Sequence, residues 1–304
     1  MIRHKTSGRT RLGLTLATIT MLAWATLPVA LSAMLRDLDP LTLIWFRFLA
    51  ASVVLSIILG LRGSLPKLSA LGPKGWLLLV LGILFMSANY WLFLTGLSLT
   101  TPANTQILMQ ISPLIFALGG ITFFGEQFSR RQWIGFFILI AGIAVFCSDQ
   151  LLAFFADVDR YLLGYAAVLA AAFSWAISSL IQKRLLTIFR SQALLLCLYV
   201  GCALCFTPLA HPARIAALSG EAILLLLYCA LNTLVAYGAF IAALENVEAS
   251  RAGAVTALSP IATFGFIAIT HALFPGALPP EQFSLWMLFG AATVVLGSVI
   301  TARG

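Results

Sequence analysis

Two glutamine side chains stand in an uncharged and largely apolar stretch of this chain. Gln106 and Gln110 are four residues apart in the uncharged run from Pro102 to Phe124, so they share one face of the helix that such a run forms. An amide in an apolar environment costs free energy unless it has a hydrogen-bond partner. We therefore expect this face to line a cavity or to contact a polar neighbour. In a cavity it would bind a ligand through neutral hydrogen bonds.

Other amides and hydroxyls interrupt the apolar runs in the same way. They are Asn89, Tyr90, Asn104, Asn232, Thr233 and Tyr237. For each amide, a bond to a neighbouring helix is the alternative to a role in a cavity, because such bonds hold helices together in membranes. The tyrosine hydroxyls leave the same two interpretations open. Taken together, the set predicts a neutral, hydrogen-bonding pocket.

Carboxylates, which are common groups for acid–base and metal chemistry, are missing from the interior of the apolar runs. The ten acidic residues all stand at the ends of runs or in loops: Asp37, Asp39, Asp149, Asp157, Asp159, Glu126, Glu221, Glu245, Glu248 and Glu281. No HExxH, GxSxG or phosphate-loop motif occurs, so we expect no enzyme activity, no catalytic residue, no metal site and no cofactor. A proton-driven antiporter needs a buried titratable group in its path. The sequence therefore favours a facilitator or an exchanger driven by the substrate's own gradient.

The composition places these residues in a membrane. Hydrophobic residues make up 61% of the sequence and charged residues 9%, with a mean hydropathy of +1.03, whereas soluble proteins carry about 25% charged residues. Ten apolar runs of the kind that cross a bilayer follow one another: Leu12 to Leu35, Leu41 to Leu61, Gly75 to Leu97, Pro102 to Phe124, Trp133 to Cys147, Tyr161 to Ile181, Gln192 to Ala210, Ala222 to Leu244, Ala252 to Phe274 and Phe283 to Ala302. The prediction is an all-α polytopic membrane protein with ten transmembrane helices.

The basic residues predict the topology. With the N-terminus inside, fourteen of the 18 Lys and Arg residues fall in cytoplasmic segments and three in external ones. This bias predicts that both termini are cytoplasmic, in a bacterial-type inner (plasma) membrane. Because the positive charge marks the ends of runs, the net charge of +8 does not indicate nucleic-acid binding. Arg47 alone lies within a run, about two turns from its outer end, where we favour snorkelling or helix pairing.

An internal repeat organises the chain. The stretch from Thr100 to Phe146 returns from Leu258 to Ile300. The matched landmarks are Ser112-Pro113 with Ser259-Pro260, Glu126-Gln127-Phe128-Ser129 with Glu281-Gln282-Phe283-Ser284, and Gly135 and Gly142 with Gly290 and Gly297. Ten helices in two copies give five per copy, and because five is odd the second copy is inverted. We expect a cytoplasmic tail at 1–11, five-helix repeats at 12–149 and 161–304, and an external linker at 150–160.

Inverted repeats are typical of secondary transporters, whose substrate sits near the midplane and is exposed alternately to each side. Tyr90 and Tyr237 match at the same offset as Pro113 and Pro260. In one interpretation the two prolines kink their helices and act as matching hinges. In the other, a neighbour satisfies the freed carbonyl and nothing moves.

Several residues along the chain form a family pattern: Trp24, Phe46-Arg47-Phe48, Ser112-Pro113, Gly125-Glu126, Gly135, Gly142, Trp175, Lys183-Arg184, Pro260, Glu281, Gly290 and Gly297. The pattern covers almost the whole chain and resembles the drug/metabolite transporter superfamily, in its ten-helix EamA-type branch. The second copy departs from it in lacking a glycine directly before Glu281. The resemblance implies a cavity lined by the first, third, fourth, sixth, eighth and ninth helices. It also implies transport, usually outward, of amino acids, nucleotide precursors, sugars or other metabolites.

Within such a cavity, Trp24 and Trp175 occupy matching places in the two copies. They would stack on an apolar or aromatic part of a substrate, and packing in the bundle or at the membrane interface is the alternative. Arg251, at the cytoplasmic mouth of the ninth helix, would attract a carboxylate or would serve as a positive-inside anchor.

These features favour a secondary transporter that exports a small metabolite. The substrate that we expect is an amino acid or a related zwitterion. A multidrug/proton antiporter and a sugar-phosphate or nucleotide-sugar exchanger remain alternatives. The expected partners are a small-molecule substrate and the lipid bilayer, and both a monomer and a homodimer stay open.

Overall fold

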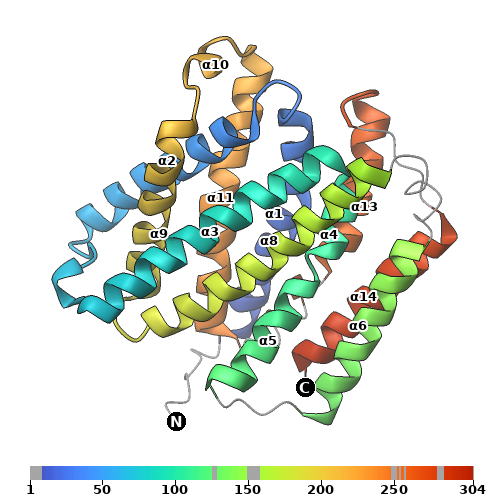
Figure 1. Ribbon diagram of the computed structural model, residues 1–304, viewed down its shortest axis with the longest axis horizontal. Helices are drawn as coiled ribbons and strands as arrows, with labels where there is room; N and C mark the ends of the chain where they lie inside the picture. The colour runs from blue at the N-terminus through green and yellow to red at the C-terminus, as the bar shows by residue number, and fades with distance from the viewer. Residues whose placement is uncertain are drawn as a thin grey trace.

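The computed structural model describes residues 9–124, 129–148, 158–247, 252, 255–256, 258–278 and 284–303, and within these ranges the chain forms α-helices joined by turns (Figure 1). The α-helices are α1 (Thr10–Met34), α2 (Pro40–Leu61), α3 (Pro73–Leu99), α4 (Pro102–Leu108), α5 (Ile111–Phe124), α6 (Arg130–Ser148), α8 (Val158–Leu185), α9 (Ser191–Phe206), α10 (Ala213–Ala216), α11 (Gly220–Asn246), α13 (Ser259–Leu273) and α14 (Leu285–Arg303).

Local side-chain chemistry sets where helices begin. The Asp39 carboxylate accepts a hydrogen bond from the Thr42 backbone N–H at the start of α2, and the Ser219 hydroxyl accepts one from the Ala222 N–H at the start of α11. Such caps satisfy N–H groups that have no partner within the helix. Asp39 also forms a 3.2 Å ion pair with Arg214, which ties the start of α2 to the α10 segment.

Seven of the described helices are long and apolar enough to cross a membrane, namely α1, α2, α3, α6, α8, α9 with its following turn, and α11. The helices α13 and α14 are shorter but apolar, and α4 and α5 together cover the fourth apolar run. The predicted all-α membrane fold with ten transmembrane segments is confirmed.

The helices pair in a reciprocal order. The first helix of the chain, α1, packs on α11, and α3 packs on α8, while α2 meets α9, α4 meets α13 and α6 meets α14. In terms of the two repeats, the first helix of each contacts the third helix of the other, and the second, fourth and fifth helices each meet their own counterpart. A two-fold axis between the repeats produces this pattern. With five crossings per repeat, the two repeats are inverted, as the sequence predicts.

The glycines that mark the repeat form the seam between α6 and α14. A Cβ atom placed on Gly135 would lie 2.7 Å from the Gly297 carbonyl oxygen, and one placed on Gly290 would lie 2.6 Å from the Phe146 backbone nitrogen. Both distances are too short for any side chain, so the backbones touch directly. Small residues permit such close approach of helices in membranes. In Figure 1 this pair stands together at one side of the bundle.

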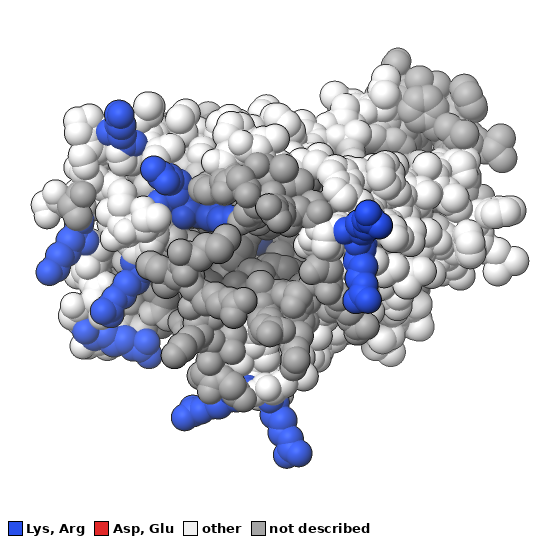
Figure 2. All heavy atoms as spheres, turned by 90° about the horizontal axis from the view of Figure 1, so that it is seen from below, with Lys and Arg blue, Asp and Glu red and all other residues white. Residues whose placement is uncertain are grey.

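One end of the molecule carries basic side chains. Figure 2 views the molecule from below, towards the end where α14 finishes in Figure 1, and shows Lys and Arg but no Asp or Glu among the described residues on this face. The connection from α2 to α3 carries Arg62 and Lys67, Lys74 lies in the first turn of α3, and the connection from α8 to α9 carries Arg190. The described part of the chain therefore has a charge asymmetry between its two ends.

Candidate functional site

The fourth apolar run is broken near its middle. α4 ends at Leu108 and α5 begins at Ile111, which places the break just before Pro113 in the first turn of α5. Pro113 has no N–H to donate to the Met109 carbonyl, and the backbone N–H and hydroxyl of Ser112 donate to that carbonyl instead. A neighbouring residue thus satisfies the freed carbonyl.

A comparable interruption precedes α13. This helix begins at Ser259, with Pro260 in its first turn and the Leu258 backbone forming a turn with Val255. The Thr263 hydroxyl donates to the Ser259 carbonyl at 2.9 Å and contacts the Ala25 carbonyl of α1 at 3.0 Å. Both repeated Ser-Pro pairs therefore lie where a membrane helix starts anew inside the bundle.

The two interruptions meet across the repeats. The Gln106 Nε2 atom donates to the Ser259 hydroxyl at 2.9 Å, and both side chains are buried. The predicted polar face of the fourth helix thus contacts a polar neighbour from the other repeat at this point. Gln110, one turn further along, lies beside the break and is only partly buried.

Tyr90 and Tyr237, which match in the sequence, come together in space. Tyr237 of α11 forms an edge-to-face contact with Trp24 of α1, with ring centroids 6.0 Å apart. Tyr90 of α3 interacts with Tyr237 and packs on Phe48 at 4.6 Å. Trp24 and Tyr237 are partly exposed, whereas Tyr90 is buried. One aromatic cluster therefore joins α1 and α3 of the first repeat to α11 of the second.

Trp175 belongs to a separate contact. Its ring meets Phe116 of α5 at 6.2 Å, edge to face, and it is partly exposed. The two tryptophans thus take corresponding roles, since each packs against a helix of the opposite repeat. The contacts of the described residues do not bring Trp175 to Trp24.

The buried asparagines follow the alternative interpretation, bonds between helices. Asn89 donates to the Ala171 carbonyl of α8 at 2.8 Å, and Asn232 donates to the Ala23 carbonyl of α1 at 2.8 Å. These bonds join α3 to α8 and α11 to α1, two contacts that the two-fold axis relates. Asn232 retains a free group all the same: its Oδ1 atom is buried without a hydrogen-bond partner among the described residues.

Arg47 lies inside the bundle, contrary to a snorkelling role. The residue is 1% exposed, its Nε donates to the Thr233 hydroxyl of α11 at 3.1 Å, and its guanidinium carbon stands 5.3 Å from the centre of the Tyr90 ring. The helix-pairing interpretation is the one that agrees with this geometry. The sequence signal was the sole charge within an apolar run, and what the sequence could not supply was the direction in which the side chain points.

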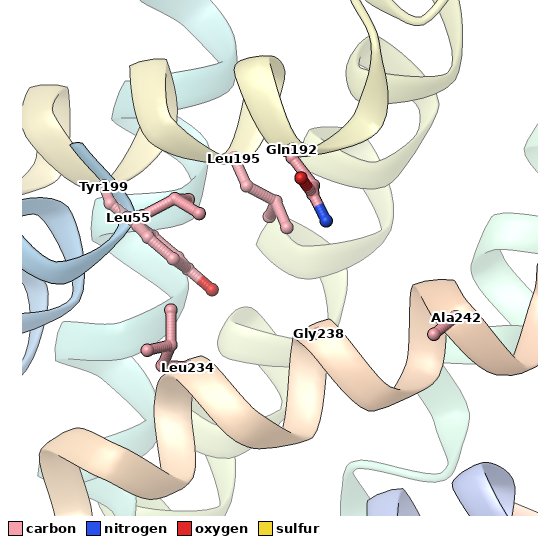
Figure 3. A pocket seen from close by; sticks show the side chains of 7 residues that line it. All are labelled: Leu55, Gln192, Leu195, Tyr199, Leu234, Gly238 and Ala242. Carbon is pink, nitrogen blue, oxygen red and sulfur yellow. The ribbon is translucent and has the colours of Figure 1, made fainter. Parts of the chain in front are cut away.

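A small cavity of about 80 Å³ lies between α2, α9 and α11. Figure 3 shows the Tyr199 hydroxyl and the Gln192 amide pointing into it, with Leu234 and Gly238 on the opposite wall. The Tyr199 hydroxyl donates to the Thr233 carbonyl at 3.5 Å. The cavity has room for water but not for a metabolite. Sequence reasoning missed Gln192 and Tyr199, because neither repeats between the two copies.

Arg251, expected at the cytoplasmic mouth of the ninth helix, lies outside the described residues. Among the residues that are described, no group of three or more His, Cys, Asp or Glu side chains comes together.

Comparison with known proteins gives a consistent picture. A sequence model described as the EamA-like transporter family matches residues 11–148 and again 162–303. An "Uncharacterized transporter" of Haemophilus influenzae is 33% identical over 96% of this chain and 95% of its own length. The "Uncharacterized inner membrane transporter YhbE" of Escherichia coli K12 is 31% identical over 96% of this chain and 92% of its own.

More distant likenesses extend over similar lengths. A "Probable amino-acid metabolite efflux pump" of Escherichia coli K12 is 24% identical over 95% of this chain and 94% of its own. A protein of known crystal structure superposes with a TM-score of 0.65 at 19% identity, covering 97% of this chain and 96% of its own. At that identity the superposition concerns the fold alone.

Proposed function

The chain belongs to the EamA-like transporter family, and on that premise we propose that it exports a small metabolite across the inner membrane, with amino acids and related zwitterions as the substrates that fit best. It is a membrane transporter and not an enzyme. The proposed part concerns the substrate, the direction of transport and the residues that bind. A distant relative with the printed name of an amino-acid metabolite efflux pump supports the substrate class.

The observation that carries the proposal is the cluster of Trp24, Tyr90 and Tyr237. It joins helices of both repeats, and substrate sites of inverted-repeat transporters lie where the repeats meet. Trp24 and Tyr237 are partly exposed, so they present an indole face and a phenol to the space beside them. An aromatic face offers a large apolar contact, and the phenol adds a polar group.

The neutral groups around this cluster suit a zwitterion. The buried Asn232 Oδ1 atom lacks a partner among the described residues, and an ammonium group is a hydrogen-bond donor that would satisfy it. Asn232 is held beside Trp24 by its bond to the Ala23 carbonyl. Gln110 and Trp175 extend the proposed binding set from α4–α5 and α8, while Asn89 and Gln106 support it through their bonds between helices.

Alternating access requires that the contact between repeats changes. In the proposal, the interruptions before Pro113 and Pro260 are the points where α4–α5 and α13 bend, because a helix that lacks a backbone hydrogen bond resists bending less. The termini lie in the cytoplasm, and the basic face in Figure 2 supports that orientation because positively charged loops face the cytoplasm.

Counterflow in proteoliposomes tests the proposal. Vesicles containing the full-length protein are loaded with an unlabelled mixture of the twenty amino acids and diluted into the same mixture carrying a ¹⁴C label. Transient accumulation of label above that in protein-free vesicles is expected for at least one amino acid. A comparison of extracellular metabolites between overexpressing and deletion cells then tests the outward direction. Counterflow of a hydrophobic cation or a sugar phosphate, with none for amino acids, would instead favour one of the two alternative substrates.

A further inference from the structure

The most unusual group in the bundle is the Arg47 guanidinium. Arg47 lies seven residues into α2, about 10 Å along the helix axis from its start, and it is 1% exposed. A guanidinium has five N–H donors and no acceptor. One of the five, on Nε, reaches the Thr233 hydroxyl, and the Tyr90 ring faces the group. Among the described residues, no further hydrogen bond of the guanidinium is seen.

No carboxylate pairs with this charge among the described residues. Among the described residues, the ion pair that α2 forms is between Asp39 and Arg214, at the outer end of the helix. A charge inside a membrane bundle is costly, and such charges normally pair with one another or with carbonyls. The free-energy cost of moving a charge out of water is offset only where an opposite charge and further hydrogen bonds interact with it. In the part of the chain that the structure describes, Arg47 has the hydrogen bond and the ring but no opposite charge.

The groups around the guanidinium are neutral among the described residues. The guanidinium faces the Tyr90 ring, and the Thr233 hydroxyl accepts from its Nε while donating to the Cys229 carbonyl at 3.0 Å. Tyr90 interacts with Tyr237, which contacts Trp24. The guanidinium thus lies against Tyr90, one of the residues proposed to bind substrate. Tyr199 lines the cavity of Figure 3.

We propose that Arg47 binds the carboxylate of the transported substrate through its terminal nitrogens, beside the ring of Tyr90. This inference rests on the proposed function and narrows its substrate class to solutes that carry one carboxylate. The planar guanidinium can hold both oxygens of a carboxylate, and the bound anion supplies the missing opposite charge. The indole of Trp24 and the Oδ1 atom of Asn232 then contact the rest of the solute. A cation, by contrast, would be repelled.

The first test needs no variant. Proteoliposomes that contain the full chain are preloaded either with the twenty amino acids or with the corresponding amino-acid amides, which lack the carboxylate charge, and uptake of the ¹⁴C-labelled amino acids is measured. The expected result is counterflow with the amino-acid preload and at least a ten-fold smaller signal with the amides. Equal counterflow with both preloads would overturn the inference while leaving the proposed function intact. Absence of counterflow with either preload would count against both.

The second test uses Arg47→Gln and Arg47→Lys, with Arg62→Gln at the exposed C-terminal end of the same helix as the matched control. We expect Arg47→Gln to raise the KM for a transported amino acid at least ten-fold, Arg47→Lys to raise it less, and Arg62→Gln to leave it unchanged. Melting and gel filtration of each variant in detergent report folding separately. An Arg47→Gln variant that is folded and has an unchanged KM would refute the role of Arg47. If that variant does not fold, the comparison of amino acids with amino-acid amides still tests whether the carboxylate is needed for transport.

Discussion

Gly142 of α6 and Gly290 of α14 lie against each other: a Cβ atom placed on Gly142 would stand 3.0 Å from the Gly290 carbonyl oxygen and 2.6 Å from the Val294 backbone nitrogen. The obstacles are backbone atoms, which cannot swing aside as a flexible side chain can. A single added methyl group must therefore separate the two helices.

We expect Gly142→Ala and Gly290→Ala each to destabilise the protein by about 1–3 kcal/mol, the usual cost of overpacking. Thermal unfolding in detergent measures the effect. Gly265→Ala on α13 is the matched control, because a Cβ atom there meets no atom within 4 Å, and its melting temperature should not fall. Equal melting temperatures for all three variants would contradict the backbone contact seen between α6 and α14.

The bond between Gln106 and Ser259 predicts energetic coupling between the repeats. A double-mutant cycle of Gln106→Ala and Ser259→Ala should give a coupling energy of about 0.5–1.5 kcal/mol, because each single change leaves a buried polar group without its partner. Denaturation of the purified protein provides the four free energies. Gln106→Ala combined with Ser52→Ala is the control cycle, since the Ser52 hydroxyl bonds within its own helix, and it should show no coupling.

The aromatic cluster predicts a selective loss of transport. Trp24→Ala should lower amino-acid counterflow about ten-fold, while Trp24→Phe should retain part of it, because a smaller ring still supplies an apolar face. Trp286→Ala is the control, as Trp286 is 63% exposed on α14, away from the cluster. The same loss in both alanine variants would show that Trp24 acts through general packing.

The hydrogen-bonding groups of Asn232 can be removed with little change in side-chain size. Asn232→Leu removes both the bond to the Ala23 carbonyl and the free Oδ1 atom, and we expect lower counterflow together with lower stability. Asn232→Asp keeps an acceptor at the same place, so this variant should bind the ammonium group of the substrate more tightly than the Asn232→Leu variant does. KM values for one transported amino acid, measured alongside melting temperatures, separate the two effects.

The cap of α2 predicts a pH-dependent contribution to stability. Burial alone would raise the pKa of Asp39, but hydrogen bonds from Thr42 and the charges of Arg214 and His211 outweigh it and lower the pKa below the ordinary value of 3.8. A carboxylate whose pKa is lower in the folded state stabilises the fold above its unfolded pKa. That contribution is lost as the pH falls through the lowered value.

Asp39→Ala should therefore destabilise the protein by about 1 kcal/mol at pH 7, as expected for a lost cap. The difference in melting temperature from the wild type should shrink below pH 3.8, as the wild-type carboxylate itself becomes protonated. Asp37→Ala, on the exposed turn before α2, is the control. A difference that stays constant across this range would argue against a charged Asp39 at the cap.

The architecture could be predicted because it depends on features that sequence records directly. Ten apolar runs, an odd number of helices per copy and four repeated glycines lead to paired, inverted repeats, and the glycines prove to be the contact between α6 and α14. For the interruption at Met109 and Gln110, the sequence predicted only a kink. Its exact place depends on which group donates a hydrogen bond to the carbonyl that Pro113 leaves free.

The candidate site was harder to read for a physical reason. In a membrane bundle apolar residues cover most sides of each helix, so periodicity does not show which way a side chain points. Matching offsets identified Tyr90 and Tyr237, which do meet, whereas Arg47 has no counterpart in the second repeat and its burial emerged only from the packing of α2 against α11.

Because α1 packs on α11 and α3 packs on α8, each repeat needs the other repeat to bury its helix surfaces. A fragment containing one set of five helices would expose the surfaces its missing partners cover. The geometry is that of an isologous dimer, in which a five-helix unit binds an upside-down copy of itself, now covalently joined into one chain.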